Sequence, residues 1–440
     1  MYAVQTKHRI PINLKQLTTL AATMTPTFFF EGSDGHTLRI GLGAVSEHVT
    51  LPHHQAYAEA RQWLAAVKGE LPIGTDVAVM GGFPFESTGL RLAEMAEASV
   101  LFLPQLSLLK VGPNTFDVTA IDTTAGAARS RLDQFLAAVQ ATVPRVSTRA
   151  ALHQATELKV EAFRRGVEQT VRRLQTQSDL KKVVLSRRLQ ATAEQAFLPE
   201  TEWLRIRRQN PETYHILLKS GSTAFLSSTP ERLLKMTGDR FETAAVAGTT
   251  PRGATTDQDV MLGRTLLRDA KNRWEHDLVV TTIDSILRTA GVVATHRSEP
   301  ILMKNRTVQH LYTPFSGVVG QSVDAFAVAG ALHPTPALGG LPTAAALTVI
   351  AEVEQQPRGL FGAPIGYVSL NGEAEFAVGI RSAQLRGVSA TLFAGAGIVA
   401  ESVAENEIQE TRLKFRPMME TLFKRSVEQD GLIAEAKRET

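Results

Sequence analysis

The sequence contains no cysteine among its 440 residues. This absence excludes disulfide bonds, thiolate metal sites, iron–sulfur clusters and cysteine nucleophiles. A site for a metal ion must therefore use other ligands, and carboxylate oxygens suit a hard cation such as Mg²⁺.

Long hydrophobic runs are also missing from the chain. No stretch reaches the roughly 18 consecutive apolar residues of a membrane-spanning helix. The richest stretch, residues 326–353, is interrupted by His333 and by three prolines. The basic residues Lys7, His8 and Arg9 are not followed by the apolar segment of a signal peptide. We therefore expect a cytoplasmic protein with no membrane partner.

A strong charge of one sign is absent as well. The 47 Lys and Arg residues nearly balance the 44 Asp and Glu residues, which leaves a net charge of +3. This excess is too small for an electrostatic footprint on nucleic acid, so we expect no nucleic-acid partner. The residues carry no signal for an oligomeric state.

The composition is that of a folded protein with a sizeable core. Hydrophobic residues make up 43% of the chain and charged residues 21%, which excludes a disordered chain. We find neither an internal repeat nor a linker-like segment. The first 150 residues alternate between expected strands at 28–30, 38–45, 77–85 and 100–110 and expected helices at 55–67 and 124–141.

The second half of the chain shows clearer periodicity. Apolar residues from Val160 to Leu174 recur at helical spacing, and the segment that starts at Lys182 predicts a strand. Ser220-Gly221-Ser222 and Asn371-Gly372 predict hairpin turns. The hairpin strands are expected at 214–219, 223–228, 365–370 and 374–385, and long helices at 264–287 and 405–422. Hairpins with intervening helices indicate an α+β fold with antiparallel sheets, not a doubly wound parallel sheet.

Three carboxylates on the two long helices could form a metal site. Glu407 and Glu410 are spaced i and i+3, so they share one side of a helix, and Glu275 lies on the other helix. Such a set suits Mg²⁺. From spacing alone, however, helical acids are more often surface residues with Lys and Arg neighbours.

Three further features could build a ligand site. The segment 393–398, expected as a loop, has Gly395 and Gly397, where a backbone can approach a ligand closely. Arg381 lies in an apolar strand and, if buried, needs an anionic partner, either a structural carboxylate or an acidic ligand. Lys182 at the start of a strand can act as a base if burial favours its neutral form, although most such lysines do not.

The order of the motifs resembles the chorismate-utilising enzymes: isochorismate, salicylate, anthranilate and aminodeoxychorismate synthases. The resemblance covers about residues 160–430, and residues 1–150, which include Gly81-Gly82-Phe83-Pro84-Phe85, are similar to the N-terminal part of the menaquinone-type isochorismate synthases. The motifs begin at Lys182, Ser228, Ala247, Glu275, His310, His333, Phe361, Gly366, Ile380, Gly395 and Glu407.

The resemblance implies one large α+β fold, with two antiparallel sheets packed as a core, helices outside and the active site in a cleft. Residues 1–150 would be woven into this fold, and residues 151–435 would form the catalytic, chorismate-binding region. It also implies Mg²⁺ as cofactor, bound by Glu275 and Glu410 with help from Glu407.

The same resemblance assigns the remaining site residues. Lys182 would be the general base and Glu231 the general acid, for which the pKa of Glu231 must be raised through burial. Arg381 would bind the enolpyruvyl carboxylate of chorismate. The other expected substrate contacts are Thr249, His310, Ala337, Leu338, Phe361 and Gly395.

A few positions discriminate among the family members. Ala247 stands where aminodeoxychorismate synthases carry a nucleophilic lysine, and Lys182 stands where anthranilate synthases typically have glutamine. We therefore expect water as nucleophile and no glutaminase subunit. Phe361 and Ile380 favour an isochorismate synthase, a reversible isomerase, over a salicylate synthase, which goes on to eliminate pyruvate. The product could enter either the menaquinone or a siderophore pathway, and the N-terminal resemblance favours menaquinone.

Overall fold

The structure is a computed structural model that describes residues 1–6, 9–53, 55–88, 99–145, 148–177, 179–305, 308–320 and 323–424. Residues 425–435, the end of the predicted catalytic region, lie outside the described residues. Every pair of named strands in the described part is antiparallel. The strands form one hydrogen-bonded network that divides into two arms at a single long strand, β6 (Ser99–Gly112).

The first arm starts on one side of β6, at β4 (Leu38–Thr50). From there the pairing continues through β3 (Thr27–Glu31), β10 (Tyr214–Ser220), β11 (Thr223–Thr229), β20 (Ser382–Arg386), β21 (Ser389–Ile398) and β9 (Lys182–Ala193). Strand β9 also pairs with β8 (Leu152–Glu157) and β17 (Gly340–Leu341).

The second arm starts on the other side of β6, at β5 (Ala78–Gly82). It continues through β18 (Pro364–Ser369), β19 (Ala374–Val378), β12 (Arg232–Thr237), β13 (Arg240–Pro251) and β16 (Val308–Val319), and ends at β14 (Val292–His296) and β15 (Ile301–Lys304). On the same side of β6, β7 (Thr115–Asp122) carries β1 (Tyr2–Gln5) and β2 (Ile10–Pro11).

An apolar core fills the space between the two arms. Phe28 and Phe30 of β3 and Tyr214 of β10 share a buried cluster with Ile365 and Tyr367 of β18. The rings of Phe30 and Tyr367 meet edge to face, with centroids 5.4 Å apart, a favourable arrangement for aromatic pairs. The two arms are thus the two packed antiparallel sheets that the resemblance implies, and the expected α+β fold is confirmed.

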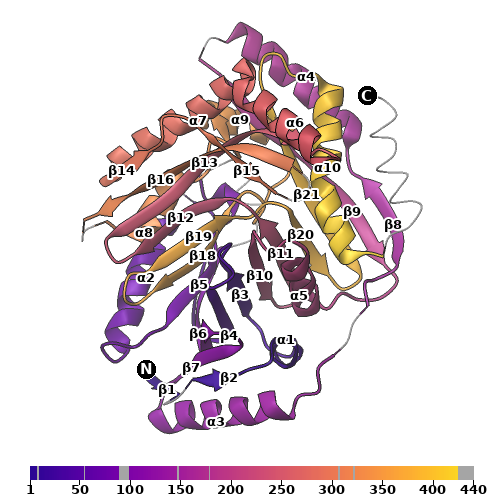
Figure 1. Cartoon of the computed structure of the whole chain (residues 1–440). Coiled ribbons are helices and arrows are strands. Elements are labelled where there is room, and N and C mark those ends of the chain that lie inside the picture. The colour runs from indigo at the N-terminus through magenta and orange to yellow at the C-terminus, as the bar shows by residue number, and fades with distance from the viewer. Residues whose placement is uncertain are drawn as a thin grey trace.

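Helices cover the outer faces and the ends of the sheets (Figure 1). Figure 1 shows α3 at one end of the molecule, near the N-terminus, and α6 and α7 at the opposite end. The helices are α1 (Leu14–Ala21), α2 (Ala56–Glu70), α3 (Ala125–Ala141), α4 (Val160–Thr176), α5 (Pro199–Gln209), α6 (Thr256–Arg268), α7 (Ala270–Thr289), α8 (Ala325–Leu332), α9 (Thr343–Glu354) and α10 (Ala404–Leu422), with a short 3₁₀ turn at Phe85–Thr88. None of the helices in the described ranges is both long and apolar enough to cross a bilayer.

Three local expectations were wrong. The helix expected at 264–287 is two helices, because Asp269 has an extended backbone and its side chain accepts a hydrogen bond from the Asn272 amide, which starts α7. The strand expected at 374–385 ends at Val378 and resumes at Ser382. The segment 393–398, expected as a loop, is the end of strand β21.

Candidate active site

Lys182 and Glu275 form an ion pair where the end of β21 meets helix α7. Lys182 opens β9 and is 3% exposed. Its Nζ donates a hydrogen bond to Oε1 of Glu275 over 2.6 Å. Gly397 on β21 makes this position possible, because a Cβ there would lie 2.8 Å from Cε and 3.3 Å from Nζ of Lys182. The glycine therefore leaves the space that the lysine side chain fills.

Glu231 is a buried carboxyl group between β11 and β12, with 7% of its surface exposed. The Thr335 hydroxyl donates a hydrogen bond to its Oε1 over 3.2 Å. Burial raises the pKa of Glu231 to about 7, against the lowering effects of Thr335, Lys182 and Arg381. The expectation of a raised pKa is confirmed, so a large fraction of Glu231 holds a proton near neutral pH.

Helix α10 contributes two carboxylates with different environments. Burial, and then the charge of Glu410, raises the pKa of Glu407 to about 7. Burial also disfavours ionisation of Glu410, but the Lys414 ammonium outweighs it, with help from Arg381 and Lys182, and lowers the pKa of Glu410. The carboxylates of Glu407 and Glu410 thus repel each other in an environment that is partly shielded from water.

Arg381 lies in the break between β19 and β20, in the left-handed backbone region with φ of 49°. A residue with a side chain pays about 1–2 kcal/mol for this conformation. Among the described residues its guanidinium has no hydrogen-bond or ion-pair partner. Arg381 lines a cavity of about 290 Å³ together with Thr213 and Ser228, and none of the other expected site residues lines this cavity. Burial lowers its pKa, while the charges of Glu410 and Glu231 act in the opposite sense. Glu410 and Glu231 are thus near enough to act on Arg381 through their charge, but within the described part of the chain no carboxylate forms an ion pair with it.

Thr249 and His310 face each other across β13 and β16. Their Oγ1 and Nδ1 atoms are 2.9 Å apart, next to a bulge at Gly248. Burial, followed by the charges of Arg381 and Lys414, lowers the pKa of His310 to about 3. The imidazole is therefore neutral at pH 7 and can orient a ligand without adding charge.

The remaining expected contacts lie around the same place. Phe361 is buried, stacks on Phe393 with centroids 5.5 Å apart, and its Cζ is 3.7 Å from the Cβ position of Gly395. Ala337 and Leu338 are in the turn before β17, which pairs with the first residues of β9, Lys182 included.

Two polar residues of the site were missed by the sequence analysis. Lys414 contacts Glu410 and donates a hydrogen bond to the Gly395 carbonyl oxygen over 2.7 Å. Its position one helical turn after Glu410 was the available signal. Thr335, the donor to Glu231, belongs to the His333-Pro334-Thr335 motif but had no assigned role. No sequence pattern links it to a carboxyl group 104 residues away.

The donor set at Glu275, Glu407 and Glu410 has the chemistry of a hard-cation site. All three are carboxylates. Burial and then the charge of Glu410 raise the pKa of Glu407, and a bound cation would relieve the repulsion between these two groups. The site is not preassembled: within the described part of the chain, no three His, Asp or Glu side chains are grouped closely enough to hold a metal ion. The ammonium groups of Lys182 and Lys414 instead neutralise Glu275 and Glu410.

Comparison with known proteins defines the class to which this fold and site belong. The family model of the chorismate-binding enzymes matches residues 3–423, and the chain belongs to that family. The resemblance seen in the motifs is thereby confirmed.

The relatives of this chain narrow the class further. Isochorismate synthase MenF of Bacillus subtilis is 32% identical over 351 residues, which are 78% of this chain and 74% of that protein. Isochorismate synthase EntC of Escherichia coli is 39% identical over 240 residues, which are 54% of this chain and 61% of that protein. Among solved structures, MenF, the menaquinone-specific isochorismate synthase from Escherichia coli, superposes with a TM-score of 0.82 at 25% identity and covers 96% of this chain and 95% of its own.

Proposed function

We propose that this protein is an isochorismate synthase, which converts chorismate reversibly to isochorismate. One observation carries the proposal. A buried lysine, a carboxyl group with a pKa of about 7 and an arginine that forms no ion pair with any described residue are electrostatically coupled in one site. The relatives named isochorismate synthase support the same reaction.

The residues divide the chemistry between them. Once Lys182 has left Glu275 and released its ammonium proton to solvent, its neutral amine accepts a proton from a water molecule, which then attacks C2 of the chorismate ring. Glu231 donates its proton to the departing C4 hydroxyl, so that this group leaves as water and the ring double bonds shift. Because one hydroxyl replaces another, the two sides are close in energy and the reaction runs in both directions.

Charge complementarity supports the orientation of the substrate. Chorismate is a dianion, and Arg381 has a full guanidinium fork available for its enolpyruvyl carboxylate. The ring lies among Thr249, His310, Phe361 and Gly395 in this proposal, with Ala337 and Leu338 at the edge. The neutral His310 avoids a competing cation beside Arg381.

Mg²⁺ is the proposed cofactor, held by Glu275 and Glu410 with help from Glu407. When bound, it neutralises the ring carboxylate of chorismate, which these glutamates would otherwise repel. Lys182 and Lys414 must then give up their present carboxylate partners.

Two positions support an isochorismate synthase that stops before pyruvate loss, namely Phe361 and Ile380. The menaquinone pathway is the proposed destination of the product, on the basis of the N-terminal resemblance and the likeness of 96% of the chain to the menaquinone-specific enzyme.

The first test is to incubate the protein with chorismate and Mg²⁺ and to resolve the products while following pyruvate. We expect isochorismate in equilibrium with chorismate and no pyruvate. Salicylate with an equal amount of pyruvate, or no conversion at all, would overturn the proposal.

A further inference from the structure

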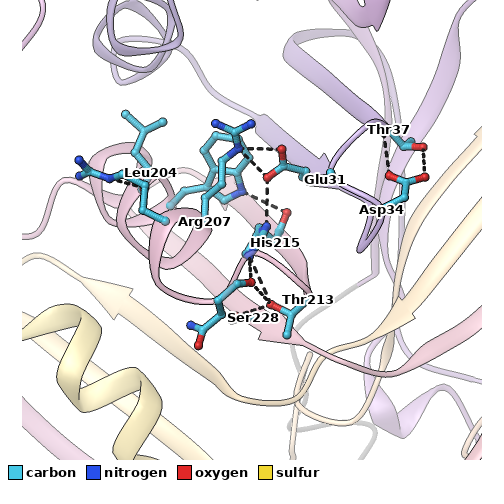
Figure 2. Close-up of polar contacts among 12 residues, drawn as sticks. Glu31, Asp34, Thr37, Leu204, Arg207, Thr213, His215 and Ser228 are labelled. Carbon is cyan, nitrogen blue, oxygen red and sulfur yellow. Dashed lines mark hydrogen bonds and ion pairs between the residues drawn. The ribbon is translucent and has the colours of Figure 1, made fainter. Parts of the chain in front are cut away.

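A buried ionic cluster joins β3, α5 and β10. Arg207 donates from Nε to both carboxylate oxygens of Glu31, over 2.7 and 2.6 Å. Nδ1 of His215 lies 3.0 Å from Oε2 of the same carboxylate. Glu31 is 2% exposed and His215 is 1% exposed. Figure 2 shows Arg207 and Glu31 facing each other, with His215 between Glu31 and the hydroxyl groups of Thr213 and Ser228.

Both ring nitrogens of His215 have buried oxygen partners. Nδ1 lies 3.0 Å from Oε2 of Glu31, and Nε2 lies 2.8 Å from the carbonyl oxygen of Asn210. These two contacts fix the orientation of the imidazole ring. His215 is 3.3 Å from the Thr213 hydroxyl and 3.0 Å from Glu31, a set that resembles a catalytic triad. Both ring nitrogens are already engaged by these contacts, however, so we interpret the cluster as a structural support.

The support reaches the proposed substrate site through two hydroxyl groups. Oγ1 of Thr213 and Oγ of Ser228 are 2.8 Å apart, and both residues are buried. The Thr213 hydroxyl also donates to the Asn210 carbonyl oxygen over 3.0 Å, which Nε2 of His215 shares. The Ser228 amide donates a hydrogen bond over 3.2 Å to the carbonyl oxygen of Arg381. The chain of contacts therefore runs from the ionic cluster to the backbone of Arg381.

Arg381 needs such a support because nothing on its own side chain holds it. Its backbone is in the left-handed region, and among the described residues its guanidinium has no partner. The neighbouring residue of β11, Ser227, donates from Oγ to the Ile380 carbonyl oxygen over 2.6 Å. The end of β11 thus fixes the turn that presents Arg381 to the cavity, and Thr213 fixes the end of β11.

We propose that Thr213, His215 and Glu31 are positioning residues that hold Arg381 through Ser228 and so set the affinity for an acidic substrate. This inference rests on the proposed function, because it assigns Arg381 to a substrate carboxylate. The cluster itself touches no reacting atom. Loss of the cluster's contacts should therefore raise KM for the substrate much more than it lowers kcat.

Steady-state kinetics with chorismate separate the two effects. Removal of one buried hydroxyl in Thr213→Val or Ser228→Ala should raise KM about 3- to 10-fold and change kcat by less than about 2-fold. Thr213→Ser keeps the hydroxyl and should restore the wild-type KM. Thr170→Val is the matched control, since it removes a fully buried hydroxyl that donates to the Gly166 carbonyl oxygen within α4. A fall in kcat at constant KM, as partial misfolding would give, would contradict the proposal.

A double-mutant cycle tests the link to Arg381 directly. Arg381→Lys should itself weaken chorismate binding, and Thr213→Val should have little further effect in that background. Fully additive effects would overturn the inference. Chorismate affinity measured by calorimetry makes the cycle independent of turnover. A wild-type protein that binds chorismate without converting it would therefore refute the proposed function while the cycle still decides the role of Thr213.

Discussion

The Nζ atom of Lys182 lies 2.6 Å from Oε1 of Glu275, so the proposed base and a proposed metal ligand are ion-pair partners in the protein. The lysine side chain is almost fully buried, whereas Glu275 keeps 19% of its side chain exposed. The pair balances charge inside the site in the absence of a cation. A cation and the ammonium group must consequently compete for the same oxygen.

This competition predicts how the lysine affects metal binding. Lys182→Met removes the ammonium and should tighten Mg²⁺ binding about tenfold, the equivalent of one charged hydrogen bond. Calorimetry on the protein without substrate measures this affinity. Lys181→Met, next to the pair but exposed, should leave it unchanged. Weaker Mg²⁺ binding in Lys182→Met would mean that Glu275 is not a ligand.

The rate of reaction should depend strongly on the same lysine. Lys182→Gln should lower kcat about 10²- to 10⁴-fold if the amine activates water. Lys181→Gln should retain the wild-type kcat. Near-normal turnover of Lys182→Gln with water would remove Lys182 from the mechanism.

Glu231 should make stability fall as the pH rises. Burial raises its pKa from the ordinary 4.5 to about 7 in the folded protein, so the folded state holds a proton that the unfolded chain has lost between these values. The contribution is fully present below pH 4.5 and is lost as the pH passes through 7. Glu231→Gln stays neutral and should be more stable than the wild type at pH 8, by up to about 3 kcal/mol, but not at pH 4.

Denaturant unfolding at the two pH values measures this difference in the free energy of unfolding. Glu168→Gln, on the exposed face of α4, is the control and should show no such crossover. If Glu231→Gln is equally or less stable than the wild type at pH 8, the pKa of this carboxyl group is not raised in the folded protein.

Gly397 should be required for activity although it lies behind the lysine and carries no functional group. The Cβ of Gly397→Ala would lie 2.8 Å from Cε of Lys182, and the flexible end of that side chain is what must shift. We expect kcat to fall about 10- to 100-fold through misplacement of the base, with a nearly unchanged melting temperature. Gly126→Ala, where no atom lies within 4 Å of the new Cβ, should be neutral. A fully active Gly397→Ala variant would show that Lys182 need not be held there.

Local sequence signals predicted those parts of the fold that short-range chemistry determines. Asn371-Gly372 supplies the tight turn between β18 and β19, and the helical spacing from Val160 gave α4. The break at Asp269 was missed because helical periodicity continues through it, although its side chain caps α7. The break at Arg381 was missed for a similar reason, since its left-handed backbone is held by contacts from β11.

The site shows the same division between local and long-range information. The carboxylates of α10 could be paired from helical spacing, whereas the partners of Lys182 and Glu231 lie 93 and 104 residues away. Glu31 and Arg207, 176 residues apart, carry no motif and were not predicted. Only the order of many motifs, compared with a known family, placed Lys182, Glu231 and Glu275 in one site before the structure did.

Turnover of chorismate in ¹⁸O-labelled water tests the central claim most directly. If Lys182 activates water for attack at C2, isochorismate formed in the first turnovers carries one ¹⁸O atom, at its C2 hydroxyl. Mass spectrometry of the product decides the outcome. Unlabelled isochorismate would show that the hydroxyl moves within the substrate, and it would contradict the assignment of Lys182 and Glu231 as base and acid.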